Sequence, residues 1–329
     1  MADESRHLDN RGNNIQQQPD MASDNPETVL LLIKAGRFHF LAAGFLLYLI
    51  GALFAIRTGA PFGLFAFLAG YIVCSTAHLS VSYSNDYFDR HTDDPGKRTP
   101  FSGGSGVLVQ HPGLAPAALA CAVLLTLLSL SCTVLLIAVG GFPPGIFLFV
   151  AAGLFLGWAY SAPPFRLVER GFGELSTMMA FGFFLPLGGY IFMAKGLDLS
   201  VLPLVVPLLF LGLFFIVSVE LPDTGTDRLA GKRTLAVRSG PQAALTLGMA
   251  AAAFTTLGFG SAAILNIHPE VFFATAAVAS LAPLLAGVAG VMQGADDFRA
   301  AEQITGRNIA GIIFFCFVSV AALLVPVAG

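Results

Sequence analysis

Apolar stretches of about 20 residues recur along this chain, and they restrict its fold more than any other feature. A stretch of this length crosses a hydrocarbon core of about 30 Å as one α-helix. The fourth stretch is the shortest, and it runs into Pro163 and Pro164, which should end its helix. We predict nine spans, near Phe38–Ile56, Pro61–Ser80, Leu114–Val139, Gly145–Ala159, Leu175–Met193, Val201–Val219, Ala243–Leu265, Val271–Met292 and Ile309–Val327.

The composition agrees with a membrane protein. Charged residues form 11% of the 329 residues and hydrophobic residues form 56%, whereas soluble globular proteins carry about 25% charged residues. A net charge of −3 offers no phosphate-neutralising surface, which excludes a nucleic-acid-binding protein. The four cysteines lie in apolar runs without a CxxC spacing, which argues against a metal-binding or redox pair. The predicted fold class is therefore an all-α, polytopic membrane protein.

The N-terminal segment differs from the rest of the chain. Residues 1–28 are polar, rich in Asp, Asn and Gln, and contain no apolar stretch of the kind found in signal peptides. We predict a disordered cytosolic tail over residues 1–28 and a single transmembrane domain over residues 29–329.

The basic residues predict the orientation in the membrane. If the N-terminus is cytosolic, nine spans place all but two of the 17 Lys and Arg residues on the cytosolic side, the exceptions being Arg57 and Lys195. Cytosolic loops of membrane proteins are enriched in Lys and Arg. We therefore expect a multi-pass protein of a bacterial or archaeal cell membrane, with the N-terminus in the cytosol and the C-terminus on the opposite face.

The first acidic cluster follows the second span, in the sequence Ser-Asn-Asp-Tyr-Phe-Asp-Arg-His-Thr-Asp-Asp. If that span continues as a helix, spacings of three and four residues project Asn85, Asp86, Asp89 and Asp93 from one face. Carboxylates this close repel each other unless a cation lies among them, and hard oxygen ligands suit Mg²⁺. The alternative is a solvated acidic loop, but a second acidic cluster weighs against it.

The second acidic cluster ends the sixth span. Asp223 and Asp227 form a D-x-x-x-D pair with helical spacing, although Gly225 between them weakens a regular helix. Glu220 lies one turn earlier and is a candidate direct or indirect ligand. Both clusters lie at predicted cytosolic helix ends, so bundle packing could bring them together across one cavity. Two facing carboxylate sets are typical of a two-metal site for a diphosphate.

Basic residues follow each acidic cluster. They serve either as phosphate contacts or as ordinary cytosolic charges, and the sequence leaves both roles open. These residues are Lys97 and Arg98 after the first cluster, and Arg228, Lys232 and Arg233 after the second. Arg166 closes the stretch Tyr-Ser-Ala-Pro-Pro-Phe-Arg, and its guanidinium is suited to a forked contact with phosphate.

A glycine-rich segment, Thr-Pro-Phe-Ser-Gly-Gly-Ser-Gly over residues 99–106, follows the first acidic cluster. Its backbone N–H groups could cradle an anion, or the segment could act as a lid over the site. It lacks the Lys-Ser/Thr ending of a P-loop, so nucleotide hydrolysis is not supported.

The two acidic clusters together resemble those of the UbiA superfamily of intramembrane aromatic prenyltransferases. The stretch NDYFDRHTDD, which begins at Asn85, resembles the family's NDxxDxxxD motif at all four positions, and Asp223 and Asp227 match its second, DxxxD motif. The resemblance covers about residues 30–329. It implies a bundle of nine transmembrane helices around a central cavity.

The resemblance also implies the chemistry. The implied ligands of two Mg²⁺ ions are Asp86, Asp89, Asp223 and Asp227, assisted by Asn85 and Asp93; the implied diphosphate contacts are Lys97, Arg98, Arg166, Lys232 and Arg233. As the diphosphate leaves, the allylic carbon of the isoprenyl group gains cation character and is attacked by an aromatic acceptor. Tyr160 or Tyr83 would stabilise that cation, although aromatic residues at helix ends are also common interface anchors. The prenyl tail would lie between helices, open to membrane lipid.

The acceptor stays open. The stretch DTGTDRLAGKRTLAVRSG over 223–240 resembles menaquinone-pathway members, which prenylate 1,4-dihydroxy-2-naphthoate, whereas YSAPPFRL over 160–167 is similar to a segment of chlorophyll synthases. The continuation RTPFSGGSG departs from the RPxxSG of several branches, so a chlorin or 4-hydroxybenzoate-type acceptor is also an alternative.

A secondary transporter is the alternative of a different class. Transporters carry ionisable residues near the membrane midplane, whereas only His39 and His78 lie in apolar stretches here, each near an end. The sequence leaves the oligomeric state open.

Overall fold

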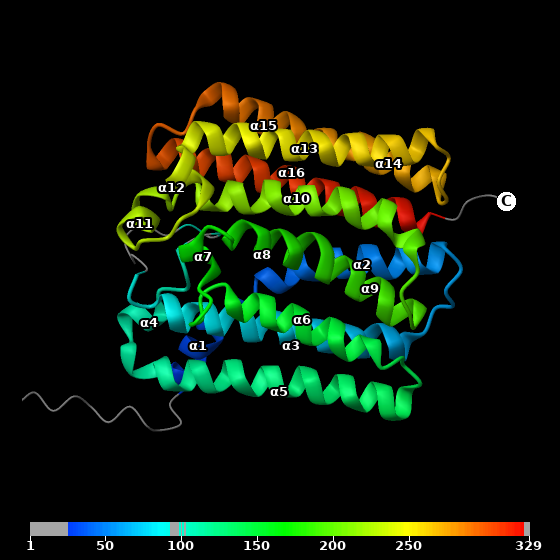
Figure 1. Cartoon of the computed structure of the whole chain (residues 1–329), viewed down its shortest axis with the longest axis horizontal. Helices are drawn as coiled ribbons and strands as arrows, with labels where there is room; N and C mark the ends of the chain where they lie inside the picture. The colour runs from blue at the N-terminus through cyan, green and yellow to red at the C-terminus, as the bar shows by residue number, and fades with distance from the viewer. Residues whose placement is uncertain (1–25, 93–98, 100, 102, 326–329) are drawn as a thin grey trace, which may run out of the picture.

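The computed structural model describes residues 26–92, 99, 101 and 103–325, and these residues form helices and turns without a β-strand. The long helices lie side by side as one bundle (Figure 1). The helical elements are α1 (Pro26–Ala35), α2 (Phe40–Arg57), α3 (Leu64–Asp89), α4 (Val107–Gln110), η1 (Pro112–Leu114), α5 (Ala115–Gly140), α6 (Gly145–Ala159), α7 (Leu167–Arg170), α8 (Gly173–Met179), η2 (Ala180–Phe184), α9 (Leu185–Ala194), η3 (Leu199–Val201), α10 (Leu202–Glu220), α11 (Thr224–Leu229), α12 (Leu235–Ser239), α13 (Pro241–Ile264), α14 (Glu270–Ala279), α15 (Leu281–Gln293) and α16 (Phe298–Leu324).

Eight helical stretches in the described part of the chain are long and apolar enough to cross a membrane. The all-α membrane fold is thereby confirmed. The fourth predicted span corresponds to α6, an apolar helix of 15 residues that ends at Ala159, before the two prolines. This length falls short of the roughly 20 residues that a full crossing needs. By length, therefore, the structure supports eight spans, and the ninth stays a prediction.

Two predicted spans are interrupted inside. The fifth consists of α8, a π-helical turn (η2) and α9, which follow one another without a gap. The eighth consists of α14 and α15, which meet at the fully buried Ser280. The Ser280 hydroxyl donates a hydrogen bond to the hydroxyl oxygen of Thr256 at 2.9 Å, which satisfies it inside the apolar bundle.

The helix of the last predicted span begins before Ile309. Helix α16 already begins at Phe298, where the side chain of Asp297 accepts a hydrogen bond from the backbone N–H of Ala300 at 2.7 Å. Thr305 and Asn308 lie buried on α16 and donate hydrogen bonds to Ser218 of α10, at 2.6 Å to its carbonyl and 2.9 Å to its hydroxyl. These polar side chains have partners within the bundle, so the helix extends beyond the apolar part of the sequence.

Residues 1–25 of the predicted N-terminal tail lie outside the described residues, and residues 26–28 already belong to α1. The carbonyl of Leu32 in α1 accepts a hydrogen bond from the hydroxyl of Tyr83 in α3 at 2.9 Å. Helix α1 is therefore attached to the bundle directly before the first acidic cluster.

Glycines bring α2 and α9 into direct backbone contact. A Cβ atom at Gly51 would overlap the carbonyl oxygen of Pro186, and one at Gly189 would overlap the carbonyl oxygen of Tyr48. Glycine at Gly182 likewise leaves room for the backbone of Leu208 in α10. At these positions glycine permits close packing of the helix backbones.

The two ends of the bundle differ. Figure 1 shows the short helices α4, α7, α11 and α12 gathered at one end, together with α1, whereas α16 ends toward the opposite one. The end with the short helices also carries both acidic clusters, because α3 and α10 finish there.

Candidate active site

The described residues of the first acidic cluster, Asn85, Asp86 and Asp89, lie on the last turns of α3, because this helix continues to Asp89. Asp86 is 5% exposed, and its carboxylate accepts two hydrogen bonds from Ser105: one from the backbone N–H at 2.7 Å and one from the hydroxyl at 2.6 Å. The glycine-rich segment is thus tied to the end of α3. Gly103 and Gly104, which precede Ser105, have positive φ angles of 79° and 66° and line the cavity described below. Asp93, Lys97 and Arg98 lie outside the described residues.

The second acidic cluster lies in a turn between two helices. Helix α10 ends at Glu220, Pro222 follows in the turn, and α11 begins at Thr224. The backbone N–H of Asp227 donates to the carbonyl of Asp223 at 2.8 Å, so the D-x-x-x-D pair forms the first turn of α11. Gly225 does not prevent this single turn.

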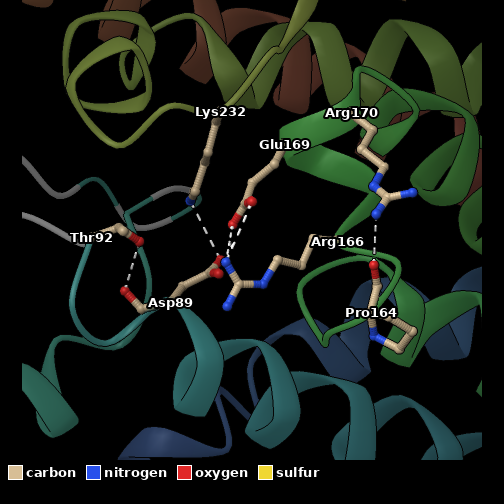
Figure 2. A network of polar contacts seen from close by, with 7 residues as sticks. All are labelled: Asp89, Thr92, Pro164, Arg166, Glu169, Arg170 and Lys232. Carbon is tan, nitrogen blue, oxygen red and sulfur yellow. Dashed lines mark hydrogen bonds and ion pairs between the residues drawn. The ribbon is translucent and has the colours of Figure 1, made fainter.

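Lys232 joins the two acidic clusters. Its ammonium nitrogen lies 3.4 Å from Oδ2 of Asp89 and 3.6 Å from Oδ1 of Asp227, and all three side chains are largely buried. The backbone N–H of Lys232 also donates to the carbonyl of Asp227 at 2.9 Å, which fixes the start of the lysine side chain. Figure 2 shows the ion pair with Asp89. Two segments far apart in the sequence are thus held together by one cation.

The two clusters line one cavity of about 290 Å³, whose walls come from α2, α3, α6, α8, η2, α9, α10, α11 and the loops beside them. Eight sequence-predicted site residues are among those that line it: Asn85, Asp86, Asp89, Tyr160, Glu220, Asp223, Asp227 and Lys232.

Arg166 and Arg233 are not among the residues that line the cavity. Arg166 forms an ion pair with Glu169 at 3.1 Å, and both side chains are about half exposed (Figure 2). Arg233 is exposed, and its backbone N–H donates to the carbonyl of Val168. Tyr83 is also absent from the cavity wall, because its ring packs toward α1 and α5 instead.

Burial and crowding of negative charge set the electrostatics of the site. Burial raises the pKa of Asp227 to about 7, with a further contribution from the charges of Asp223 and Asp89, whereas the Lys232 ammonium opposes this shift. Burial also raises the pKa of the Tyr160 hydroxyl well above its usual value, and nearby carboxylates, Glu220 foremost, add to the effect. Tyr160 is therefore a neutral phenol, and the cavity favours a bound cation.

The side chains at the cavity fit a magnesium ion bridged to phosphate. The Oδ1 atom of Asn85 is buried without a hydrogen-bond partner. In the part of the chain that the structure describes, no three His, Cys, Asp or Glu side chains stand close enough to hold a metal alone. Mg²⁺ commonly binds through one or two carboxylates together with substrate phosphate, so this all-oxygen set suits it.

Two residues at or beside the site could not be recognised from the sequence. Arg37 lines the cavity and donates to the carbonyl of Phe101 at 3.3 Å, although its position alone marks it only as a cytosolic charge. Glu174 is 5% exposed on α8, and its carboxylate accepts a hydrogen bond from the backbone N–H of Leu235 at the start of α12. It thereby anchors the segment after Lys232, and nothing in its neighbourhood in the sequence predicts this.

A second, apolar pocket of about 130 Å³ adjoins the cavity between α3, α6 and η2. Its wall includes Cys74, Ala77 and Phe149. Five residues line both spaces and mark the junction between them: His78, Val81, Gly157, Ala180 and Leu185.

Solved structures share this fold. A UbiA homologue from Archaeoglobus fulgidus superimposes with a TM-score of 0.65 at 16% identity, covering 90% of this chain and 100% of that one. The same homologue bound to DMAPP and Mg²⁺ gives a TM-score of 0.60 at 16% identity, with 89% and 99% covered. A structure of digeranylgeranylglyceryl phosphate synthase gives a TM-score of 0.64 at 13% identity. The match covers 91% of this chain and 99% of that one.

The sequence itself decides the family. A comparison with curated proteins gives no match. A sequence model of the UbiA prenyltransferase family, however, matches residues 44–303, a range that contains both acidic clusters and most of the bundle. The chain therefore belongs to the UbiA prenyltransferase family.

Proposed function

We propose that this protein transfers a polyprenyl group from an isoprenyl diphosphate to 1,4-dihydroxy-2-naphthoate, a step of menaquinone-type quinone biosynthesis. One observation supports placing the transferase site in this cavity. Asp89 and Asp227, from the two acidic clusters, contact the same Lys232 ammonium across it. The family consists of prenyltransferases, which decides against the transporter alternative.

The residues of the cavity would hold the diphosphate and stabilise its departure. Asp86, Asp89, Asp223 and Asp227, with Asn85 and Asp93, would hold two Mg²⁺ ions; these, when bound, would neutralise charge on the leaving diphosphate. Lys232 would donate hydrogen bonds to the diphosphate oxygens, as its position between the clusters allows. Tyr160, a neutral aromatic in the cavity wall, would stabilise the allylic cation through its ring face. The binding of DMAPP and Mg²⁺ by a UbiA homologue supports this assignment.

The apolar pocket would hold the prenyl tail. It adjoins the polar cavity, and its wall consists mainly of Val, Ala, Leu and Phe side chains. Apolar surface of this kind favours isoprenoid carbons over water. The carbon–oxygen bond that breaks would then lie near the junction of the two spaces.

Product analysis tests the acceptor. Purified protein with Mg²⁺ and geranylgeranyl diphosphate is incubated separately with 1,4-dihydroxy-2-naphthoate, 4-hydroxybenzoate and a chlorin, and the products are identified by mass spectrometry. We expect a prenylated naphthoate that requires Mg²⁺. A prenylated benzoate or chlorin without naphthoate product would reject the menaquinone-type branch and keep the transferase; no product with any acceptor would reject aromatic prenyl transfer.

The orientation of the bundle is a separate proposal. We infer that the end with the acidic clusters faces the cytosol, because the loops there carry most of the Lys and Arg residues. A reporter enzyme fused after Gly329 is then expected to be active only on the non-cytosolic face. Activity of that reporter in the cytosol would contradict this orientation, and a reporter fused before Met1 serves as the opposite control.

A further inference from the structure

Helix α1 carries apolar side chains on the side that faces away from the bundle. Its sequence is Pro-Glu-Thr-Val-Leu-Leu-Leu-Ile-Lys-Ala. Val29, Leu30 and Ile33 are 55%, 67% and 48% exposed, and spacings of three and four residues place them on one face of the helix. We call these three residues the outer stripe. A helix at the boundary between a protein and water normally turns its polar residues outward, so the outer stripe is the reverse of that pattern.

The opposite side of α1 is packed onto the bundle. Ala35 is fully buried, and Leu31 is partly buried beside it. Both belong to a cluster of apolar side chains from α3, α4, η1 and α5: Tyr83, Val107, Leu108, Leu114, Ala118 and Ala122. In the part of the chain that the structure describes, α1 is therefore seated on its inner side and uncovered at the outer stripe.

The contact with α5 indicates the depth of α1 in the membrane. Figure 1 shows α1 beside the start of α5. The apolar stretch Pro112–Gly140, which contains α5, has 29 residues and is roughly 43 Å long at 1.5 Å per residue. A hydrocarbon core of about 30 Å leaves about 7 Å of it outside at each end. Ala118 and Ala122, the buried residues of α5 in the cluster with α1, lie about 9 and 15 Å from its start. Helix α1 is thus level with the edge of the hydrocarbon core.

Other parts of this chain offer no suitable cover for the outer stripe. The sequence before α1, residues 1–25, is polar and contains no apolar stretch. A stable contact with a second copy would bury about 800 Å² on each partner, and three aliphatic side chains supply far less. The α5 helix next to α1 exposes further apolar side chains, among them Leu124 and Leu127, and lipid is what covers a spanning helix of this kind.

We propose that α1 is an interfacial helix whose outer stripe is covered by the acyl chains of membrane lipid, in the leaflet at the end of the bundle that carries the acidic clusters. Helices of this kind bury their apolar face about 5–10 Å into the boundary between headgroups and acyl chains. Lys34, exposed in the last turn of α1, can lay its aliphatic part along this surface and direct its ammonium toward the headgroups. The proposal does not depend on which acceptor the enzyme prenylates.

Tryptophan fluorescence in a bilayer tests this depth. The chain has one tryptophan, Trp158, so Trp158→Phe provides a background without any. Leu30→Trp in this background is reconstituted into nanodiscs of phosphatidylcholine, either plain or brominated on the acyl chains close to the headgroup. Because Leu30 faces away from the bundle, the indole ring takes its place without displacing a neighbour. We expect the brominated lipid to quench about half of the emission, since bromine at this depth would touch the indole.

Two further variants in the same background calibrate the signal. Leu127→Trp, at an exposed apolar position of α5 inside the spanning stretch, reports full contact with lipid. Arg228→Trp, at an exposed polar position of α11, reports contact with water, and acrylamide in the aqueous phase should quench it strongly. Size-exclusion chromatography checks that each variant is folded. If Leu30→Trp is not, Ile33→Trp of the same stripe replaces it.

The bromine quenching of Leu30→Trp decides the proposal. Quenching at least half as strong as that of Leu127→Trp supports an interfacial α1. Weaker quenching overturns the proposal, and acrylamide then identifies what covers the stripe instead. Strong quenching by acrylamide would place the outer stripe in water, whereas protection from both quenchers would place it against protein, such as a second copy of this chain. Prenyl transfer is measured separately, so neither result decides the proposed function.

Discussion

Asp86→Asn and Asp223→Asn should each lower kcat/KM by a factor on the order of 10³, because each removes a negative charge from the proposed diphosphate site. Asparagine keeps the size of the side chain, so packing around the cavity should persist. Both residues line the cavity, one from each acidic cluster. The measurement is single-turnover product formation in detergent over a range of Mg²⁺ concentrations. Added Mg²⁺ should recover only part of the loss, since the site would have lost a ligand and not merely affinity.

Ser105→Ala is the matched control for Asp86. The Asp86 carboxylate anchors the glycine-rich segment through Ser105, so a loss in Asp86→Asn has two possible origins. Ser105→Ala removes the contacts of the hydroxyl with Asp86 and with the backbone N–H of Val107, and it leaves the Asp86 charge in place. We expect it to cost far less activity than Asp86→Asn. Activity close to the wild type in Asp86→Asn or Asp223→Asn would refute the metal assignment of that residue, and equal losses in Ser105→Ala and Asp86→Asn would attribute the effect to the loop.

Ala77→Phe should change which prenyl chain the enzyme accepts. Ala77 lines the apolar pocket and not the polar cavity, so a phenyl ring there fills the tail site and spares the diphosphate site. Burial stabilises each CH₂ group by about 0.8 kcal/mol, and five carbons give about 4 kcal/mol, or a factor of roughly 10³, per isoprene unit. We expect kcat/KM for geranylgeranyl diphosphate to fall by up to that factor, while the value for dimethylallyl diphosphate changes little.

Ala120→Phe is the control for this chain-length shift. Ala120 is exposed on α5, where the same added ring meets no cavity. Both variants are compared with the wild type by competition between the two diphosphates in one reaction, and size-exclusion chromatography checks that Ala77→Phe remains folded. If Ala77→Phe reduced the use of both diphosphates equally, the apolar pocket would not be the tail site.

The sequence predicted the helices better than their interruptions. Hydropathy depends on side chains facing lipid and core, so the long apolar stretches could be located directly. The early start of α16 could not be located in this way, because Thr305 and Asn308 are polar. Their hydrogen-bond partner is on α10, and only the folded bundle brings it near. The break at Ser280 differs, because Pro283 lacks the N–H that would bond the carbonyl of Ala279, so the sequence marks this interruption.

The candidate site was predictable where residues are spaced along one helix and not where they meet across the bundle. Asn85, Asp86 and Asp89 line one cavity because α3 continues through them. Arg166 and Arg233 looked equivalent to Lys232 by charge and proximity, yet only Lys232 lines the cavity. The difference lies in the loops: Arg166 turns to Glu169, three residues away, whereas the turn after α11 directs Lys232 inward.

The backbone contact between α2 and α9 has a mechanical consequence for the catalytic cycle. Where two helices touch through glycines, no side chains lie between them that could rearrange. This close packing makes α2 and α9 resist separation beside the cavity. A bulky substrate cannot be admitted by spreading them. The movement needed for loading and release would then come from other segments, among them the glycine-rich segment, which is held to α3 by the two Ser105 hydrogen bonds to one carboxylate.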